Sequence, residues 1–401
     1  MRIVNDTMLL LGVFFFWSSC QQLETPEPVQ TQVLWSQADS SHNNYRIPAL
    51  VVSTKQTLLA FAEGRESGDS GDIDILLRRS TDQGRSWDEQ QVVWDDGPNT
   101  CGNPCPVVDQ TSGRIYLFMT WNLGSDSEDA IIRKQSQDTR IPYFCYSDDD
   151  GLSWSEPVSL AESGKVPDWG WYATGPGVGI QLQAEPYKNR LVIPCNNSYT
   201  VEQEGEAVKG AYGYGAHVLL SDDGGQSWRM SELISPKVNE SQVVELADGS
   251  LMMNMRSYQG KACRAVSFSR DGGKSWSEPE PAPQLVESVC QGSIIRLEGH
   301  AERPLLFSNP AVPVGRTHMT VRCSFDEAKS WSNSKLIYAG PSAYSCLAAL
   351  PGGRIGLFFE AGEHHPYEKM VFISFAPEEL FSFNLLANDK LSESNLSGFL
   401  P

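Results

Sequence analysis

One short motif recurs along the 401-residue chain and limits its fold more than any other feature of the sequence. The motif is Ser-x-Asp-x-Gly-x-x-Trp. Complete copies occur at Ser80–Trp87, Ser147–Trp154, Ser221–Trp228 and Ser269–Trp276. A fifth copy, Ser324–Trp331, has Ala328 where glycine is expected. Because four fixed positions match by chance only roughly a few times per million starting points, the copies indicate a repeated structural unit.

The residue types in the motif predict a fastened hairpin. Each copy follows an apolar, strand-like stretch, such as Ile73–Arg79 before the first copy. The aspartate can bond the backbone of a tight turn, and the glycine permits a positive φ there. We expect the tryptophan to begin the next strand and to hold the turn against the blade. Successive copies start 67, 74, 48 and 55 residues apart, which suits four-stranded blades with loops of variable length.

The repeats predict an all-β fold, a six-bladed β-propeller. Further strand-like runs lie between the copies, and helical periodicity is almost absent. Five fastened blades leave sequence without a copy at both ends, which suggests one more blade, although the repeats alone also allow five or seven. We expect a strand near residues 33–35 to pair with Met370–Phe375 and close the last blade. The length alone suggests two or three domains of about 150 residues, but residues 34–401 are then one propeller domain.

The N-terminal residues predict export. Met8–Trp17 is an apolar run too short to cross a bilayer and typical of a signal peptide, which we place at residues 1–20. Ser18 and Ser19 followed by Cys20 resemble a bacterial lipoprotein box, which would place a lipid anchor on Cys20. The alternative is cleavage by an ordinary signal peptidase, with Cys20 incidental. Residues 21–33 are polar and predict a short tether. The expected location is the periplasm, the outer membrane or the cell surface.

The charge balance excludes one class of partner. The chain has 31 Lys and Arg against 50 Asp and Glu, a net charge of −19. Nucleic-acid binding needs clustered Lys and Arg, so we exclude it. A basic patch for anionic lipid is equally unexpected, which leaves an anchor at Cys20 as the only membrane contact. An anionic substrate would need a local positive pocket.

The remaining cysteines and the histidines carry no chemistry in this interpretation. Most of the eight cysteines after Cys20 stand singly in apolar runs, which predicts buried small hydrophobic residues. Cys101 and Cys105 are close enough to pair in an oxidising compartment, but their spacing does not establish a disulfide. The six histidines form no ligand spacing with cysteines or carboxylates. We therefore expect no metal site.

The eight-residue units resemble the Asp boxes of bacterial and animal sialidases, which other secreted propellers also carry. A more specific resemblance lies outside the boxes, where Tyr45–Leu50 (YRIPAL) matches the Tyr/Phe-Arg-Ile-Pro motif of sialidases. Further matching segments follow in the family's order: Ala60–Arg65, Gly68–Asp74, Asn239–Glu245, Asn254–Ser257, Gly315–Thr320, Ser342–Leu347 and Phe359–Ala361. The match covers roughly residues 40–376. It implies an exo-α-sialidase.

The resemblance assigns three arginines to the substrate's carboxylate. Sialic acid carries this carboxylate on its anomeric carbon, so the site must hold an anion beside the bond that breaks. The planar arginine fork binds carboxylate bidentately and keeps its charge. By resemblance the three residues are Arg46, Arg256 and Arg316, from different blades. Arg322 is the alternative to Arg316, but it adjoins the fifth box and we expect it to be a strand residue.

The resemblance makes Tyr344 the nucleophile and Glu240 the base that activates it. A carboxylate nucleophile would be repelled by the substrate's own carboxylate, whereas a neutral phenol is not. Glu245 competes with Glu240 for the role of base. It precedes the Asp248-Gly249 turn, and we expect it to face solvent.

The acid/base is expected to be a carboxyl group on a mobile loop over the leaving group. The loop after Arg65 offers Asp69, Asp72 and Asp74. The resemblance favours Asp69, Asp72 stays open, and Asp74 is expected to be structural. By the same resemblance Glu360 braces Arg46. Arg65 and Asn103 match positions that border the sugar's hydroxyl groups.

These assignments predict a retaining exo-α-sialidase that acts through a tyrosyl-linked intermediate and needs no metal or organic cofactor. Its expected partners are sialylated glycoproteins, glycolipids and oligosaccharides, and its expected state is a monomer. A trans-sialidase, or an intramolecular one that releases anhydro-sialic acid, is a first alternative that the sequence does not separate. A non-catalytic sialoglycan-binding propeller is the second, and it would explain the arginines but not Tyr344, Glu240 and the acidic loop.

Overall fold

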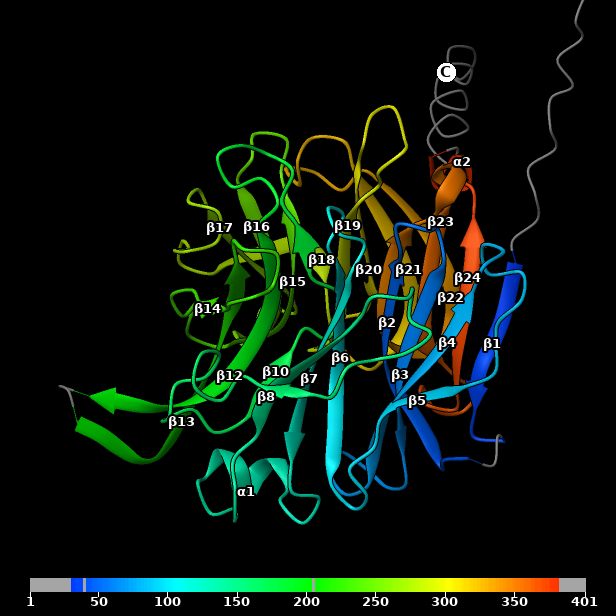
Figure 1. The fold of residues 1–401 in the computed structure, drawn as a ribbon. Coiled ribbons are helices and arrows are strands. Elements are labelled where there is room, and N and C mark those ends of the chain that lie inside the picture. The colour runs from blue at the N-terminus through cyan, green and yellow to red at the C-terminus, as the bar shows by residue number, and fades with distance from the viewer. Residues whose placement is uncertain (1–29, 39–40, 204–205, 382–401) are drawn as a thin grey trace, which may run out of the picture.

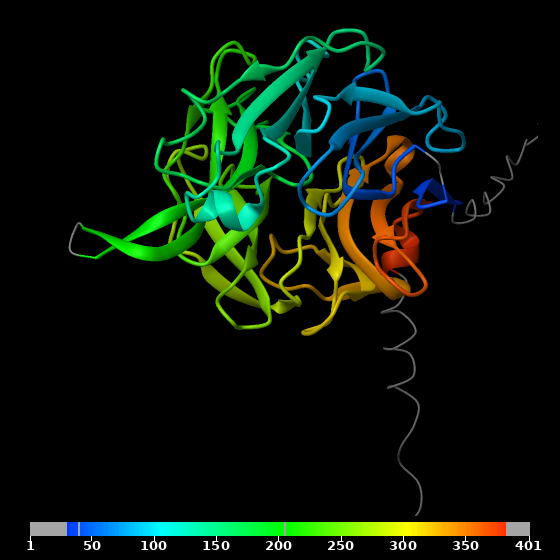
Figure 2. The same ribbon diagram turned by 90° about the horizontal axis from the view of Figure 1, so that it is seen from below.

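The computed structural model describes residues 30–38, 41–203 and 206–381. The predicted signal peptide at residues 1–20, with Cys20, and residues 21–29 of the predicted tether lie outside the described residues. Antiparallel sheets follow one another around a central axis, as the view in Figure 2 shows. No helix in the described ranges has the length and hydropathy needed to span a membrane.

The described strands form six blades, four strands deep, and they confirm the predicted propeller (Figure 1). The first three blades, from the axis outwards, are β2 (Asn44–Val52), β3 (Leu58–Arg65), β4 (Ile73–Ser80) and β5 (Gln91–Trp94); β6 (Thr100–Val108), β7 (Ile115–Asn122), β8 (Ile141–Ser147) and β9 (Val158–Ser159); and β10 (Tyr172–Thr174) with β11 (Ile180–Gln181), β12 (Leu191–Gln203), β13 (Glu206–Ser221) and β14 (Arg229–Met230).

Of the other three blades, the last two share one long strand, β22 (Asn333–Ala349). The three blades are β15 (Val238–Glu245), β16 (Leu251–Ser257), β17 (Cys263–Ser269) and β18 (Glu280–Val286); β19 (Ser293–Arg296), β20 (Leu305–Pro310), β21 (Thr317–Ser324) and the first part of β22; and the second part of β22, β23 (Ile355–Ala361), β24 (Lys369–Phe375) and β1 (Gln30–Ser36). The short helices are α1 (Glu128–Ile132), α2 (Glu378–Phe381) and the 3-10 turn Pro351–Gly353.

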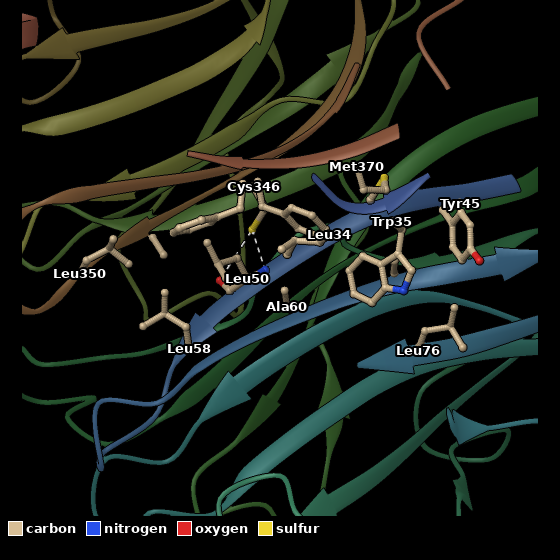
Figure 3. Packing of buried hydrophobic residues seen from close by; sticks show 14 residues of the cluster. Leu34, Trp35, Tyr45, Leu50, Leu58, Ala60, Leu76, Cys346, Leu350 and Met370 are labelled. Carbon is tan, nitrogen blue, oxygen red and sulfur yellow. Dashed lines mark hydrogen bonds between the residues drawn. The ribbon is translucent and has the colours of Figure 1, made fainter. Parts of the chain in front are cut away.

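The sixth blade closes as the sequence predicted. Strand β1 pairs antiparallel with β24, and Val33 lies opposite Val371 while Trp35 lies opposite Met370. Strand β1 begins at Gln30, so the end of the predicted tether is already part of the blade. Figure 3 shows the packing behind this closure, where Trp35 and Leu58 from opposite sides of the interface are buried together.

The Asp boxes form compact turns that the serines complete. In the first box the Gly84 backbone N–H donates to the Ser80 hydroxyl at 2.8 Å, and the Ser86 N–H donates to the Asp82 carboxylate at 2.9 Å. The Ser86 hydroxyl donates to the other oxygen of Asp82 at 2.6 Å. The seventh residue of each box is also a serine with this bond, a position that the motif left unspecified.

The box tryptophans join neighbouring blades, which corrects the expectation that each begins a strand and holds its own blade. The fourth strand starts after the tryptophan in each of the five boxed blades. The side chain instead packs into the interface with the preceding blade: Trp154 contacts Phe61 of the first blade, with ring centroids 5.7 Å apart, and Trp228 contacts Phe118 of the second at 4.6 Å. The tryptophans therefore fill the interfaces between neighbouring blades of the propeller.

The eight described cysteines are all free and buried. Burial was predicted for most of them, whereas the disulfide state was left open. Cys101 and Cys105 lie on the same strand but on opposite faces, because β6 has a bulge between Gly102 and Cys105. Cys101 packs between the first and second blades and Cys105 between the second and third. The two thiols therefore form no disulfide in this fold.

Candidate active site

The chain's path gathers the predicted site residues at one end of the propeller. Each innermost strand begins at this end, and the loops between second and third strands return to it because neighbouring strands are antiparallel. Helix α1, in one of these loops, marks this end at the bottom of Figure 1. The Asp boxes lie between third and fourth strands and therefore at the opposite end.

Irregularities in four innermost strands present the site residues. The strand pairing shifts register between Arg46 and Ala49, around Asn103, around Glu240 and around Tyr344. A bulge breaks the ladder locally and re-aims side chains. Ile47 and Asn103 accordingly have positive φ angles of 60° and 56°, which is a strained conformation for isoleucine.

A cavity of about 350 Å³ lies at this end of the axis. Its walls include most of the predicted site residues: Arg46, Arg65, Asp69, Asn103, Glu240, Arg256, Arg316 and Tyr344. The predicted brace Glu360 lies just behind the wall and is fully buried. Asp72, the open alternative to Asp69, is not among the lining residues.

The three predicted arginines surround Tyr344. The guanidinium carbons of Arg46 and Arg316 lie 5.1 Å and 5.6 Å from the centroid of its ring. A guanidinium N–H of Arg256 donates to the Tyr344 hydroxyl at 3.1 Å. This convergence of three positive charges is the local pocket that an acidic protein needs to bind an anion.

Two buried carboxylates hold this cluster together. Glu360 accepts hydrogen bonds from the Arg46 side chain at 2.7 Å and from the Ile47 backbone at 2.9 Å. Its second oxygen accepts from the Tyr344 backbone N–H at 3.0 Å. Glu240 accepts from Arg256 at 2.8 Å. Glu360 thus fixes both the first arginine and the backbone of the predicted nucleophile.

Tyr344 donates its hydroxyl hydrogen to the Glu240 carboxylate. Both side chains are buried, with relative exposures of 6% and 8%. Burial and the negative charge of Glu240 raise the pKa of Tyr344 well above its ordinary value, while Arg256 acts in the opposite direction. The phenol is therefore neutral in this state, and Glu240 is placed to take its proton.

Asp69 lies at the mouth of the cavity, and its side chain is 71% exposed. Arg65 donates to its carboxylate at 2.5 Å, and Arg46 lies 3.7 Å away. Burial by itself would raise the pKa of Asp69, but the charges of Arg65 and Arg46 hold it below its ordinary value. Asp74 instead bonds the His42 ring at 3.0 Å, which fits the structural role expected for it.

The two alternatives for other roles lie away from the cavity. Arg322 donates to the Asn309 side chain at 3.0 Å within the fifth blade. Glu245 was expected to face solvent, but it is half-buried and accepts from the backbone N–H groups of Gln183 and Ala184 at 2.8 Å and 3.0 Å. It is therefore bound to the neighbouring third blade.

Several cavity residues were not identified from the sequence. Glu63 is buried, pairs with Arg65 and accepts from the Asn103 N–H at 2.6 Å. Arg140 is also buried, donates to the Asn103 side chain at 2.7 Å and lies over the Trp171 ring at 4.2 Å. Burial is the main cause that lowers the pKa of Arg140 to about 10.

Only one of these residues had a signal in the sequence. Glu63 is a charged residue inside the apolar run Ala60–Arg65, and such a residue is usually paired when it is buried. Glu128, Tyr258 and Tyr367 also line the cavity, but they come from loops with no repeated pattern.

Comparison with known proteins gives the family. A family model for a BNR repeat-like domain matches residues 56–357. The chain is 34% identical over 365 residues to a sialidase of Micromonospora viridifaciens, across 84% of this chain and 54% of that protein. It therefore spans about half the length of that relative.

Two further matches cover a larger share of the related protein's own length. Mouse sialidase-3 is 31% identical over 413 residues, which is 90% of this chain and 97% of that protein. Among solved structures, the Hadza microbial sialidase Hz136 aligns with a TM-score of 0.74 and 29% identity, across 84% of this chain and 67% of that one. The chain therefore belongs to the sialidase family with BNR repeats.

Proposed function

We propose that the chain is a retaining exo-α-sialidase that removes terminal sialic acid from glycoproteins, glycolipids or oligosaccharides. The hydrogen bond from Tyr344 to Glu240, inside the ring of three arginines, carries this proposal. The arginines supply a site for a carboxylate, and the tyrosine supplies a nucleophile beside it. The names of the related proteins support the substrate class.

In the first step the glycosidic bond breaks and a bond to tyrosine forms. The substrate's carboxylate lies among Arg46, Arg256 and Arg316. Protonated Asp69 gives its proton to the departing glycosidic oxygen. The Tyr344 oxygen bonds to the anomeric carbon, and Glu240 takes the phenolic proton.

In the second step water replaces the tyrosine. Asp69, now a carboxylate, takes a proton from a water molecule whose oxygen bonds to the anomeric carbon. The bond to Tyr344 breaks, and the phenolate recovers its proton from Glu240. Two displacements at the same carbon retain the configuration of the sugar.

Two substitutions test the nucleophile and its base. In Tyr344→Phe we expect an unchanged fold and a loss of at least about 100-fold in turnover of a 4-methylumbelliferyl sialoside, because the attacking oxygen is gone. Glu240→Gln should also lose most turnover, since the amide cannot accept the proton. Tyr143→Phe, on β8 away from the cavity, is the matched control. Near wild-type rates in Tyr344→Phe would overturn the nucleophile assignment.

Product analysis tests the reaction class. Mass spectrometry of the products, with and without lactose as an acceptor, separates hydrolysis from transfer to the acceptor and from release of anhydro-sialic acid. We expect free sialic acid in both reactions. Binding of sialoglycans without any product would instead favour the non-catalytic alternative.

The proposal also includes the location. We propose that the chain is exported, held at the cell surface by a lipid on Cys20, and active there as a monomer. The apolar run before Cys20 supports export. Metabolic labelling with palmitate should mark the wild type and not Cys20→Ala; equal labelling would contradict the anchor.

A further inference from the structure

Tyr367 contacts two of the three arginines predicted to bind the substrate's carboxylate. It lies in the loop between β23 and β24, and its ring is 3.8 Å from the guanidinium carbon of Arg46. Its hydroxyl accepts a hydrogen bond from Arg316 at 2.5 Å. A guanidinium held over an aromatic face is stabilised by the ring's quadrupole. One side chain therefore fixes the distance between two like charges.

The three arginines differ in whether a carboxylate neutralises their positive charge. Arg46 forms an ion pair with Glu360 and Arg256 forms one with Glu240. Within the described residues Arg316 forms no ion pair, and its side-chain hydrogen bond goes to Tyr367. A phenol oxygen orients a guanidinium without neutralising it. Arg316 is thus held in place with its charge still available to an anion.

The loop that carries Tyr367 is firmly built. The Glu368 carboxylate accepts from the backbone N–H groups of Glu363, His364 and His365 at 2.8–2.9 Å. The His365 ring packs edge-on against Tyr367, with centroids 4.5 Å apart. These contacts hold the loop in place, so Tyr367 already contacts the two arginines before a substrate binds.

We propose that Tyr367 is a positioning residue for the anion clamp: it braces Arg46 and orients Arg316 toward the substrate's carboxylate. This inference rests on the proposed sialidase function. Because Tyr367 acts on groups that hold the carboxylate in both the ground state and the transition state, its loss should raise KM more than it lowers kcat.

Binding of paired inhibitors tests the role directly. The probes are the 2,3-unsaturated analogue of sialic acid and its methyl ester, which lacks the anion. In Tyr367→Phe, which keeps the stacking on Arg46, we expect the acid to bind about tenfold more weakly, as for the loss of one hydrogen bond to a charged group. The ester's affinity should not change. Tyr367→Leu, which loses both contacts, should bind the acid more weakly still.

Tyr338→Phe is the matched control. Its hydroxyl donates to the Gly362 carbonyl at 2.5 Å in the same loop but contacts none of the three arginines. It should alter thermal stability and leave the ratio of acid to ester affinity at the wild-type value. Equal weakening of acid and ester in Tyr367→Phe, or no weakening, would overturn the inference while the wild type remains active. A wild type that neither binds the acid nor cleaves sialosides would overturn the proposed function and this inference together.

Discussion

At the scale of single residues, Asp69 differs from its neighbours in the cavity. Tyr344, Glu240 and Glu360 are buried and fixed by hydrogen bonds, whereas the Asp69 side chain is mostly exposed. Its pairing with Arg65 keeps it ionised in the free protein. A general acid must be protonated to act, so in the proposed mechanism Arg65 sets the pH range over which Asp69 can donate a proton.

Replacement of Arg65 by glutamine should move the pH profile. Activity that needs a protonated acid is lost as the pH rises through the acid's pKa. Arg65 lowers the pKa of Asp69, so in Arg65→Gln we expect the falling limb of kcat/KM to move to higher pH. Arg114→Gln, which removes an arginine paired with exposed Asp148 at the opposite end of the propeller, should leave the limb in place. A shift to lower pH would contradict the role.

At this scale, sequence motifs identified most of the predicted site residues that the fold brings together around the cavity, while their roles stay predictions. The predicted residues that line the cavity come from segments with a recognisable pattern, such as YRIPAL for Arg46. Tyr367 and Arg140 could not be predicted, because their contacts depend on how loops of unrelated sequence meet across blades. Of Asp69 and Asp72, only Asp69 lines the cavity, and this difference depends on the path of their loop in three dimensions.

At the scale of elements, the Asp box is a turn whose glycine has two separate functions. Gly225 has a φ of 87°, and a Cβ placed on it would lie 2.3 Å from the Tyr116 ring of the preceding blade. The glycine therefore permits both the turn and the close approach of two blades. In the fifth box Ala328 adopts a φ of 63°, so the turn conformation itself is compatible with a Cβ.

Two glycine substitutions separate these functions. Gly97 has a φ of 59° and no neighbour near its hypothetical Cβ, so Gly97→Ala should cost only the backbone strain, about 1 kcal/mol. Gly225→Ala should cost about 3 kcal/mol, because a steric clash is added to the strain. Urea unfolding curves measure both free energies. Equal losses in the two variants would contradict the second function of Gly225.

Among the predictions for single elements, the one for the box tryptophans was wrong, because their side chains pack against the preceding blade. The motif predicts a turn correctly, because the Asp, Ser and Gly act within the eight residues. The tryptophan's partner belongs to another repeat, as Phe118 does for Trp228. The residue pattern within one repeat does not reveal which residues of another repeat the tryptophan packs against.

At the scale of the whole molecule, the ring depends on a strand from the start of the chain. Trp35 of β1 is fully buried, packs on Tyr45 and Phe358, and donates to the Gln90 side chain at 2.7 Å. It therefore joins the sixth blade to the first. The closing strand pair was predictable, because the apolar runs at the two ends of the domain are visible in the sequence. The repeats favoured six blades but also allowed five or seven, and the strand pairing gives six.

Truncation of Trp35 should weaken the closed ring. We expect Trp35→Ala to lower the free energy of unfolding by about 4 kcal/mol, through lost burial and the cavity left behind. Val33→Ala, on the same strand but 53% exposed, should change it by less than about 0.5 kcal/mol. Chemical denaturation of both variants provides the comparison. A similar loss in both would mean that strand pairing, rather than the buried indole, closes the ring.

The buried thiols between the blades have a practical consequence. Cys346 lies between the sixth and first blades, Cys101 between the first and second, Cys105 between the second and third, and Cys323 between the fifth and sixth. A thiol reagent can reach such a sulfur only when the interface around it separates. Single-cysteine variants would therefore report, through their labelling rates, how often each joint of the ring opens in the native protein.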